Sequence, residues 1–165
     1  MKSNEYFVAS IHREENVDNK NKLKIIVDTI NKIAKKYDKK INLSLHPRTK
    51  NKLIKFKLSF SEHIIDLPPF GFNDYIHLQK NAKCVISDSG TITEEAAILN
   101  FPAITIREAS ERPEGFDEGT LIMTGLKSEN ILKSIEIALS QDALSLSSIP
   151  QDYNVENFSM KILKS

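Results

Sequence analysis

Short apolar runs alternate along this chain with longer segments in which apolar residues recur every three or four positions. The runs suit buried strands, and the three-to-four spacing is typical of helices packed on a sheet. Candidate strands are residues 6–11, 41–45, 63–67, 84–87, 103–106 and 121–124. Helices are expected at 21–37, 50–58, 73–81, after Gly90, and at 128–141 with Ser128 as the N-cap.

This order of elements predicts an α/β fold, a Rossmann-like doubly wound parallel sheet of about six strands. In such sheets ligands bind outside the carboxyl ends of the strands, so the loops that follow strands are the places to look for chemistry. The 165 residues suffice for one compact domain, expected over residues 1–145. Residues 146–165 are expected to form a C-terminal loop and helix outside it.

Composition narrows the classes of partner. The 23 basic and 22 acidic residues nearly cancel, which gives no general attraction to nucleic acid or membranes and leaves an anionic ligand to local groups. The single cysteine, Cys84, excludes an internal disulfide framework and a cysteine-rich zinc site. No apolar run suits a membrane span or a signal peptide, so a cytoplasmic location is expected.

Two of the loops place a histidine beside an arginine. "HREEN" (12–16) follows the first candidate strand and "HPRT" (46–49) follows the second. Imidazole and guanidinium groups are good donors to phosphate oxygens, and nearby carboxylates such as Glu15 can orient them. The first loop could equally be a solvated charged turn. The second could be a plain helix start in which Thr49 is the cap.

The third loop, "PPFGFNDY" (68–75), carries aromatic residues. Asn73 is a natural N-cap, which would place Tyr75 in the first helical turn near the rim of the sheet. An aromatic ring there could stack on a nucleotide base. Phe70, Phe72 and Tyr75 could equally belong to the core.

The fourth loop, "SDSGTITEEA" (87–96), turns from a strand into a helix. Such a turn presents backbone N–H groups at the positive end of the helix dipole, and Gly90 would let an anion approach closely beside the Ser89 hydroxyl. Thr91 and Glu94 have the spacing of a capping box. Glu95 has no such structural role, and its carboxylate suits the vicinal hydroxyls of a ribose.

The fifth loop, "REASERPEGFDEG" (107–119), is long and highly charged. Arg107 and Arg112 could contact a diphosphate, and they could equally belong to an internal ion-pair network.

Taken in this order, "HREEN", "HPRT", "SDSGTITEEA" and "REASERPEG" resemble the C-terminal half of the non-hydrolysing UDP-N-acetylglucosamine 2-epimerases over roughly residues 5–140. "TITEEAAILNFPA" and "SERPEG" look most like the branch that makes UDP-N-acetyl-L-fucosamine for capsule and O-antigen. The resemblance implies the second domain of a GT-B fold, with a UDP-sugar bound between two domains. The tail 146–165 would pack on the other domain.

The resemblance also implies roles for individual residues. His12 and Arg13 would contact the pyrophosphate or sugar with Glu15 nearby, and His46 would reach the phosphates, with Arg48 beside it. The remaining substrate contacts would be Tyr75 at the uracil, Ser89 and Gly90 at a phosphate, Glu95 at the ribose and Arg112 supporting the phosphate loop. Thr91 departs from the family, since many relatives have a second glycine there.

The chemistry implied by the resemblance is epimerisation at C2 through loss and return of UDP, which requires no metal or redox cofactor. The family's acid and base carboxylates lie in its N-terminal domain, so this chain alone is expected to bind rather than turn over. Self-association through the uncovered cleft face is a further expectation. Two other readings stay open, a UDP-sugar binding module without catalysis and the acceptor half of a glycosyltransferase.

Overall fold

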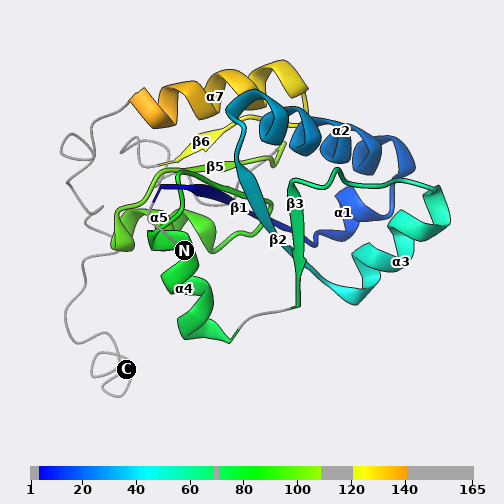
Figure 1. The fold of residues 1–165 in the computed structure, drawn as a ribbon, viewed down its shortest axis with the longest axis horizontal. Coiled ribbons are helices and arrows are strands. Elements are labelled where there is room, and N and C mark those ends of the chain that lie inside the picture. The colour runs from blue at the N-terminus through cyan, green and yellow to red at the C-terminus, as the bar shows by residue number, and fades with distance from the viewer. Residues whose placement is uncertain (1–3, 69–70, 109–120, 141–165) are drawn as a thin grey trace, which may run out of the picture.

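The computed structural model describes residues 4–68, 71–108 and 121–140 (Figure 1). A single sheet of six parallel strands has the order β3-β2-β1-β4-β5-β6. The predicted fold class is confirmed. The strands are β1 Tyr6–Ile11, β2 Lys40–Leu45, β3 Ile64–Leu67, β4 Val85–Ser87, β5 Ala103–Thr105 and β6 Ile122–Met123, each within two residues of its predicted ends.

Helices cover both faces of the sheet (Figure 1). They are α1 Glu14–Val17, α2 Lys20–Tyr37, α3 Pro47–Phe56, α4 Phe72–Lys80, α5 Ile92–Leu99 and α7 Ser128–Ser140. One core cluster joins α2 and α7 to Phe7, Ala9 and Ile11 of β1. The other joins α4 and α5 to Tyr6 and Val8 of the same strand. Because both faces of β1 are buried, its sequence is apolar at every position except Ser10 and does not alternate.

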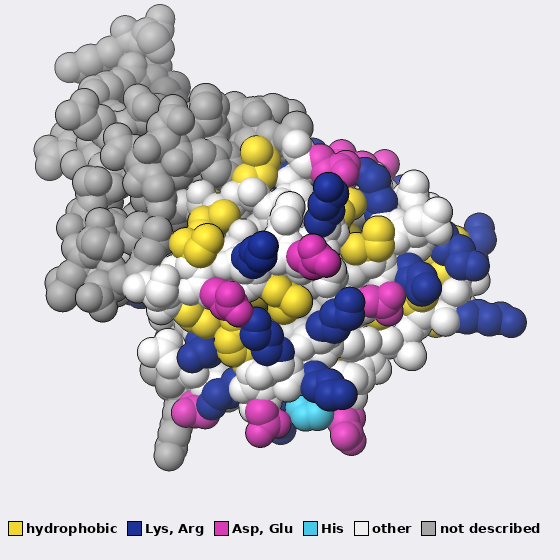
Figure 2. All heavy atoms as spheres, turned by 90° about the horizontal axis from the view of Figure 1, so that it is seen from above, with side chains coloured by type: hydrophobic (Ala, Val, Ile, Leu, Met, Phe, Trp, Pro, Cys, Tyr) yellow, Lys and Arg dark blue, Asp and Glu magenta, His cyan; other side chains and the backbone are white. Residues whose placement is uncertain are grey.

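The outer face of α2 and α7 carries mixed charges (Figure 2). Lys36 of α2 pairs with Glu136 of α7, and Lys22 lies 2.6 Å from a carboxylate oxygen of Glu108. Exposed pairs of this kind add little stability, so the α2–α7 contact depends on the apolar residues beneath. No helix among the described residues is long and apolar enough to cross a membrane.

Three predicted helix starts are wrong in detail. α3 begins at Pro47, where the ring suits the first helical position, and the cap is His46 rather than Thr49. α4 begins at Phe72 after Gly71, so Asn73 lies inside the helix. Ser128 is the first residue of α7, and its hydroxyl has no hydrogen-bond partner among the described residues.

The four-residue helix α1 was not predicted, because its charged residues carry no apolar period. The buried thiol of Cys84 has its pKa raised to about 12 by loss of solvent, so it stays protonated and unreactive. The expected tail 146–165 lies outside the described residues.

Candidate functional site

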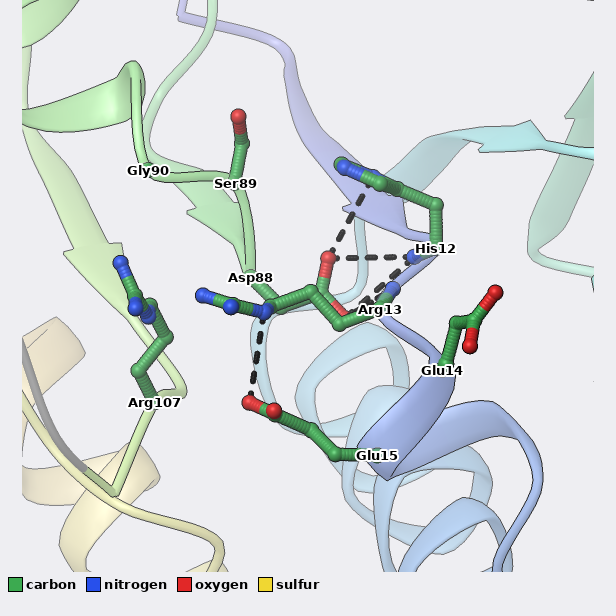
Figure 3. Close-up of a pocket in the computed structure, with 8 residues that line it drawn as sticks. All are labelled: His12, Arg13, Glu14, Glu15, Asp88, Ser89, Gly90 and Arg107. Carbon is green, nitrogen blue, oxygen red and sulfur yellow. Dashed lines mark hydrogen bonds and ion pairs between the residues drawn. The ribbon is translucent and has the colours of Figure 1, made fainter.

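A pocket lies at the carboxyl ends of β1 and β4, where the order of the strands in the sheet reverses. β1 has β2 on one side and β4 on the other, and the connections that leave these central strands diverge. A crevice at such a switch point is where open α/β sheets bind ligands. The cavity measures about 560 Å³ and is lined by His12, Arg13, Glu14, Glu15, Asp88, Ser89, Gly90 and Arg107 (Figure 3).

Asp88 joins the two central loops from a fully buried position, with 0% of the residue exposed. One carboxylate oxygen accepts the backbone N–H of Arg13 at 3.0 Å and the Asn16 side-chain amide at 3.1 Å. The other accepts the backbone N–H of His12 at 3.1 Å and lies 3.4 Å from His12 Nδ1 (Figure 3). These donors offset the cost of burying a carboxylate, and they fix the loop after β1 against the end of β4.

The loop after β1 directs cationic and acidic groups into the cavity. The Arg13 guanidinium lies 3.3 Å from a carboxylate oxygen of Glu15, so this glutamate orients it (Figure 3). His12 is partly open, with 47% of its side chain exposed. The loop is therefore a built part of the pocket rather than a fully solvated turn.

The loop after β2 behaves differently from expectation. His46 Nδ1 accepts the backbone N–H of Arg48 at 3.2 Å and so caps α3. The Arg48 guanidinium pairs with Glu14 and Asp18, and hydrogen bonds from Arg48 and then Lys52 lower the pKa of Asp18. Neither His46 nor Arg48 lines the cavity.

The turn after β4 brings Ser89 and Gly90 to the cavity wall, ahead of α5. Its amides are partly used within the turn, because Ser89 N–H donates to Ser87 Oγ at 3.0 Å and Thr91 N–H to Ser89 Oγ at 3.3 Å. The Thr91 hydroxyl lies 3.0 Å from Ser89 Oγ and makes no side-chain cap, so the predicted capping box with Glu94 does not form. The Ser89 hydroxyl is held at the rim of the pocket.

Arg107, after β5, supplies a second cation on the opposite wall (Figure 3). Its Nε atom is buried and has no hydrogen-bond partner among the described residues. Its Nη1 would lie 3.5 Å from a Cβ built on Gly90, so the guanidinium approaches the glycine directly. A half-buried guanidinium at the cavity wall favours an anion there.

Tyr75 and Glu95 are not among the residues that line the cavity. Gln79, fully buried in α4, donates to a Glu95 carboxylate oxygen at 2.7 Å. Tyr75 packs on the core of α4 and α5, and burial raises its pKa to about 12 although its hydroxyl hydrogen-bonds the Ser10 side chain. Phe72, one turn earlier, is 76% exposed and is not core.

Sequence reasoning missed Asp88 and Gln79, and it kept Arg107 only as an alternative. The signal for Asp88 was an acidic residue that directly follows an apolar run, which gives no indication of partners up to 76 positions away. The predicted Arg112 lies outside the described residues. Among the residues that the structure describes, no group of three or more histidine, cysteine and acidic side chains could hold a metal ion.

Comparison with known proteins gives the family. The sequence profile described as UDP-N-acetylglucosamine 2-epimerase matches residues 1–165. The UDP-N-acetylglucosamine 2-epimerase of Methanocaldococcus jannaschii is 43% identical over 141 residues, which are 83% of this chain and 38% of that protein. Its counterpart in Methanococcus maripaludis is 43% identical over 145 residues, 86% of this chain and 40% of that protein. The chain therefore spans about two fifths of the length of these curated relatives.

Solved structures of the same family align with this chain. The M. jannaschii enzyme in complex with UDP-GlcNAc and UDP aligns with a TM-score of 0.89 at 38% identity, covering 98% of this chain and 45% of that one. The Rickettsia bellii UDP-N-acetylglucosamine 2-epimerase aligns with a TM-score of 0.84 at 43% identity, covering 99% of this chain and 44% of that one. An E. coli heptosyltransferase, 18% identical with a TM-score of 0.60, shares the fold alone. The chain belongs to the UDP-N-acetylglucosamine 2-epimerase family.

Proposed function

We propose that this chain binds the UDP part of a UDP-N-acetylhexosamine and serves as the C-terminal half of a 2-epimerase. The observation that carries the proposal is the cavity at the switch point, where His12, Arg13 and Arg107 surround the Ser89–Gly90 turn. Cations, a hydroxyl and a helix start in one polar crevice suit a diphosphate. The complex of the M. jannaschii relative with UDP-GlcNAc and UDP supports the same ligand class.

In the proposed reaction this domain binds the diphosphate and a second domain supplies the acid and base. A base removes the C2 proton, the C–H electron pair forms the C1=C2 bond, and the C1–O bond breaks with its electrons leaving on UDP. Reprotonation from the opposite face and return of UDP complete the inversion. In this scheme His12, Arg13, Arg107 and the predicted Arg112 stabilise negative charge developing on the departing diphosphate.

The acid and base carboxylates are assigned to a separate N-terminal domain or subunit. The chain spans only 38% and 40% of its curated relatives, which leaves room for such a partner in the whole protein. We place the UDP-binding domain at residues 1–145 and the segment that contacts the partner at 146–165. Alone, the chain is expected to bind UDP-sugar without turnover.

The proposed branch of the family rests on short sequence motifs. "TITEEAAILNFPA" and "SERPEG" favour the UDP-N-acetyl-L-fucosamine branch, with a cytoplasmic role in capsule or O-antigen synthesis. His46 is proposed to approach the phosphates through its Nε2, since its Nδ1 is used in the α3 cap. Phe72 joins Tyr75 as a candidate to stack on the nucleotide base, because its side chain is exposed at the start of α4.

Titration calorimetry with UDP, UDP-GlcNAc and uridine tests the function. We expect UDP and UDP-GlcNAc to bind and uridine to bind far more weakly, because uridine has no phosphate oxygens to accept from Arg13 and Arg107. Binding without C2 proton exchange into deuterated solvent, even with the N-terminal half added, would favour a binding module over an epimerase. Equal affinity for UDP and uridine would contradict the assignment of the cavity.

Replacing Glu95 with glutamine is expected to weaken UDP binding by about 1–3 kcal/mol, the range for losing a hydrogen bond to a charged group. Gln79 holds one Glu95 oxygen at 2.7 Å, and the other oxygen is the one proposed to accept from a ribose hydroxyl. Glu94→Gln, the same change at the adjacent residue of α5, is the matched control. Unchanged UDP affinity in Glu95→Gln would remove Glu95 from the site.

A further inference from the structure

We propose that Asp88 is a positioning residue that sets the tautomer of His12, holding a proton on Nδ1 and presenting Nε2 to the pocket. The inference deepens the proposed function, although its first test does not depend on it. The Asp88 carboxylate is fully buried and lies 3.4 Å from His12 Nδ1. A carboxylate only accepts, so a lone pair on Nδ1 would face a negative oxygen, whereas an N–H there is attracted to it.

The same contacts fix where the ring stands. Asp88 also accepts the backbone N–H groups of His12 and Arg13, at 3.1 and 3.0 Å. The backbone of His12 is therefore hydrogen-bonded to the buried carboxylate, and its ring lies beside the same carboxylate. Figure 3 shows the second ring nitrogen of His12 on the side of the pocket where Ser89 lies.

The tautomer has a consequence for an anionic ligand. Neutral His12 in this form directs a lone pair at the pocket, so it can donate to a phosphate only after Nε2 takes up a proton. The other charged groups that line the pocket around His12 are Arg13, Glu14, Glu15, Asp88 and Arg107. Arg48 pairs with Glu14 from outside the cavity, so three guanidinium groups balance the three carboxylates, and an arriving diphosphate adds net negative charge beside His12. Diphosphate binding is therefore coupled to protonation of His12.

Nitrogen-15 NMR of the histidine rings tests the tautomer directly. The chain has four histidines, and the His12 signals are identified by their loss in His12→Gln. With the ring titrated to its neutral form, we expect a protonated-type shift for Nδ1 and an unprotonated-type shift for Nε2. The reverse assignment in the wild-type chain would overturn the proposal without any variant of Asp88.

Asp88→Asn is expected to reverse the tautomer. Arg13 N–H and Asn16 Nδ2 both donate to the same carboxylate oxygen, and the His12 N–H lies 3.3 Å from it. The asparagine oxygen therefore takes that place, where it accepts all three donors, and its NH₂ group faces His12 Nδ1. Nδ1 must then accept, and the proton moves to Nε2. A variant that folds, as judged by backbone amide spectra, and keeps the wild-type tautomer would contradict the positioning role.

Proton uptake on UDP binding provides the functional measurement. Calorimetry at about pH 8 in buffers of different ionisation enthalpy, where the UDP phosphates are fully ionised, should give net proton uptake for the wild type. Asp88→Asn, which already carries N–H at Nε2, should lose that uptake. Uptake that is absent in the wild type, or equal in both, overturns the coupling. The expected tautomers without any UDP binding would instead reject the proposed function and leave the role of Asp88 intact.

Discussion

Replacing Phe7 with alanine is expected to lower the free energy of unfolding by about 3–5 kcal/mol, the range for truncating a buried phenylalanine. Phe7 lies in the central strand β1 with 0% of the residue exposed. Its ring centroid is 5.2 Å from that of Tyr37 at the end of α2, so truncation opens a cavity between sheet and helix. Urea denaturation followed by circular dichroism measures the loss. Since domains are typically stable by only about 5–15 kcal/mol, the variant should unfold at a much lower urea concentration.

Phe72→Ala is the matched control for this prediction. It removes the same side chain from a position that is 76% exposed, so the expected loss is within about 0.5 kcal/mol. A similar loss for the two variants would contradict the packing of α2 on β1.

The layers of this fold could be predicted because burial determines which positions along a strand or helix are apolar. β1 is covered on both faces, and five of its six residues are apolar. In α2 the buried apolar residues recur every three or four positions. Helix ends depend on single side chains instead. Thr49, a candidate for the cap of α3, instead donates its hydroxyl to the Ile11 carbonyl at 3.1 Å, a contact with β1 that local sequence does not encode.

The candidate site was predictable only as far as strand ends determine it. His12, Arg13, Ser89 and Gly90 meet because β1 and β4 are neighbours in a parallel sheet. Which side chain then faces the cavity depends on competing partners. Arg48 was expected there, and the carboxylates of Glu14 and Asp18 hold it outside.

Asp88, in contrast, was not predicted and belongs to the site. Its importance comes from donors on another loop, among them the backbone N–H of His12, 76 positions away. Backbone donors have no residue-specific signature, so no motif could have indicated them. Only the three-dimensional arrangement identifies this carboxylate as the link between the two central loops.

Replacing Arg107 with methionine is expected to weaken UDP binding by about 2–5 kcal/mol, at least roughly 30-fold in Kd, as for removal of one partner of a buried charge pair. Arg107 lines the cavity and its Nη1 lies beside Gly90, so the guanidinium can reach a diphosphate there. Methionine keeps much of the apolar stem, which limits the effect on folding. Calorimetry with UDP and with uridine separates the phosphate contribution, and uridine binding should change far less.

Arg48→Met is the control for Arg107→Met, because it removes the same group from outside the cavity. The Arg48 guanidinium is already paired with Glu14 and Asp18, so its loss should change UDP affinity by less than about threefold. An Arg48→Met effect as large as that of Arg107→Met would show that general positive charge, rather than a group placed at the switch point, binds the nucleotide. An equal loss of UDP and uridine affinity in Arg107→Met would mean that Arg107 supports the shape of the pocket and does not contact the diphosphate.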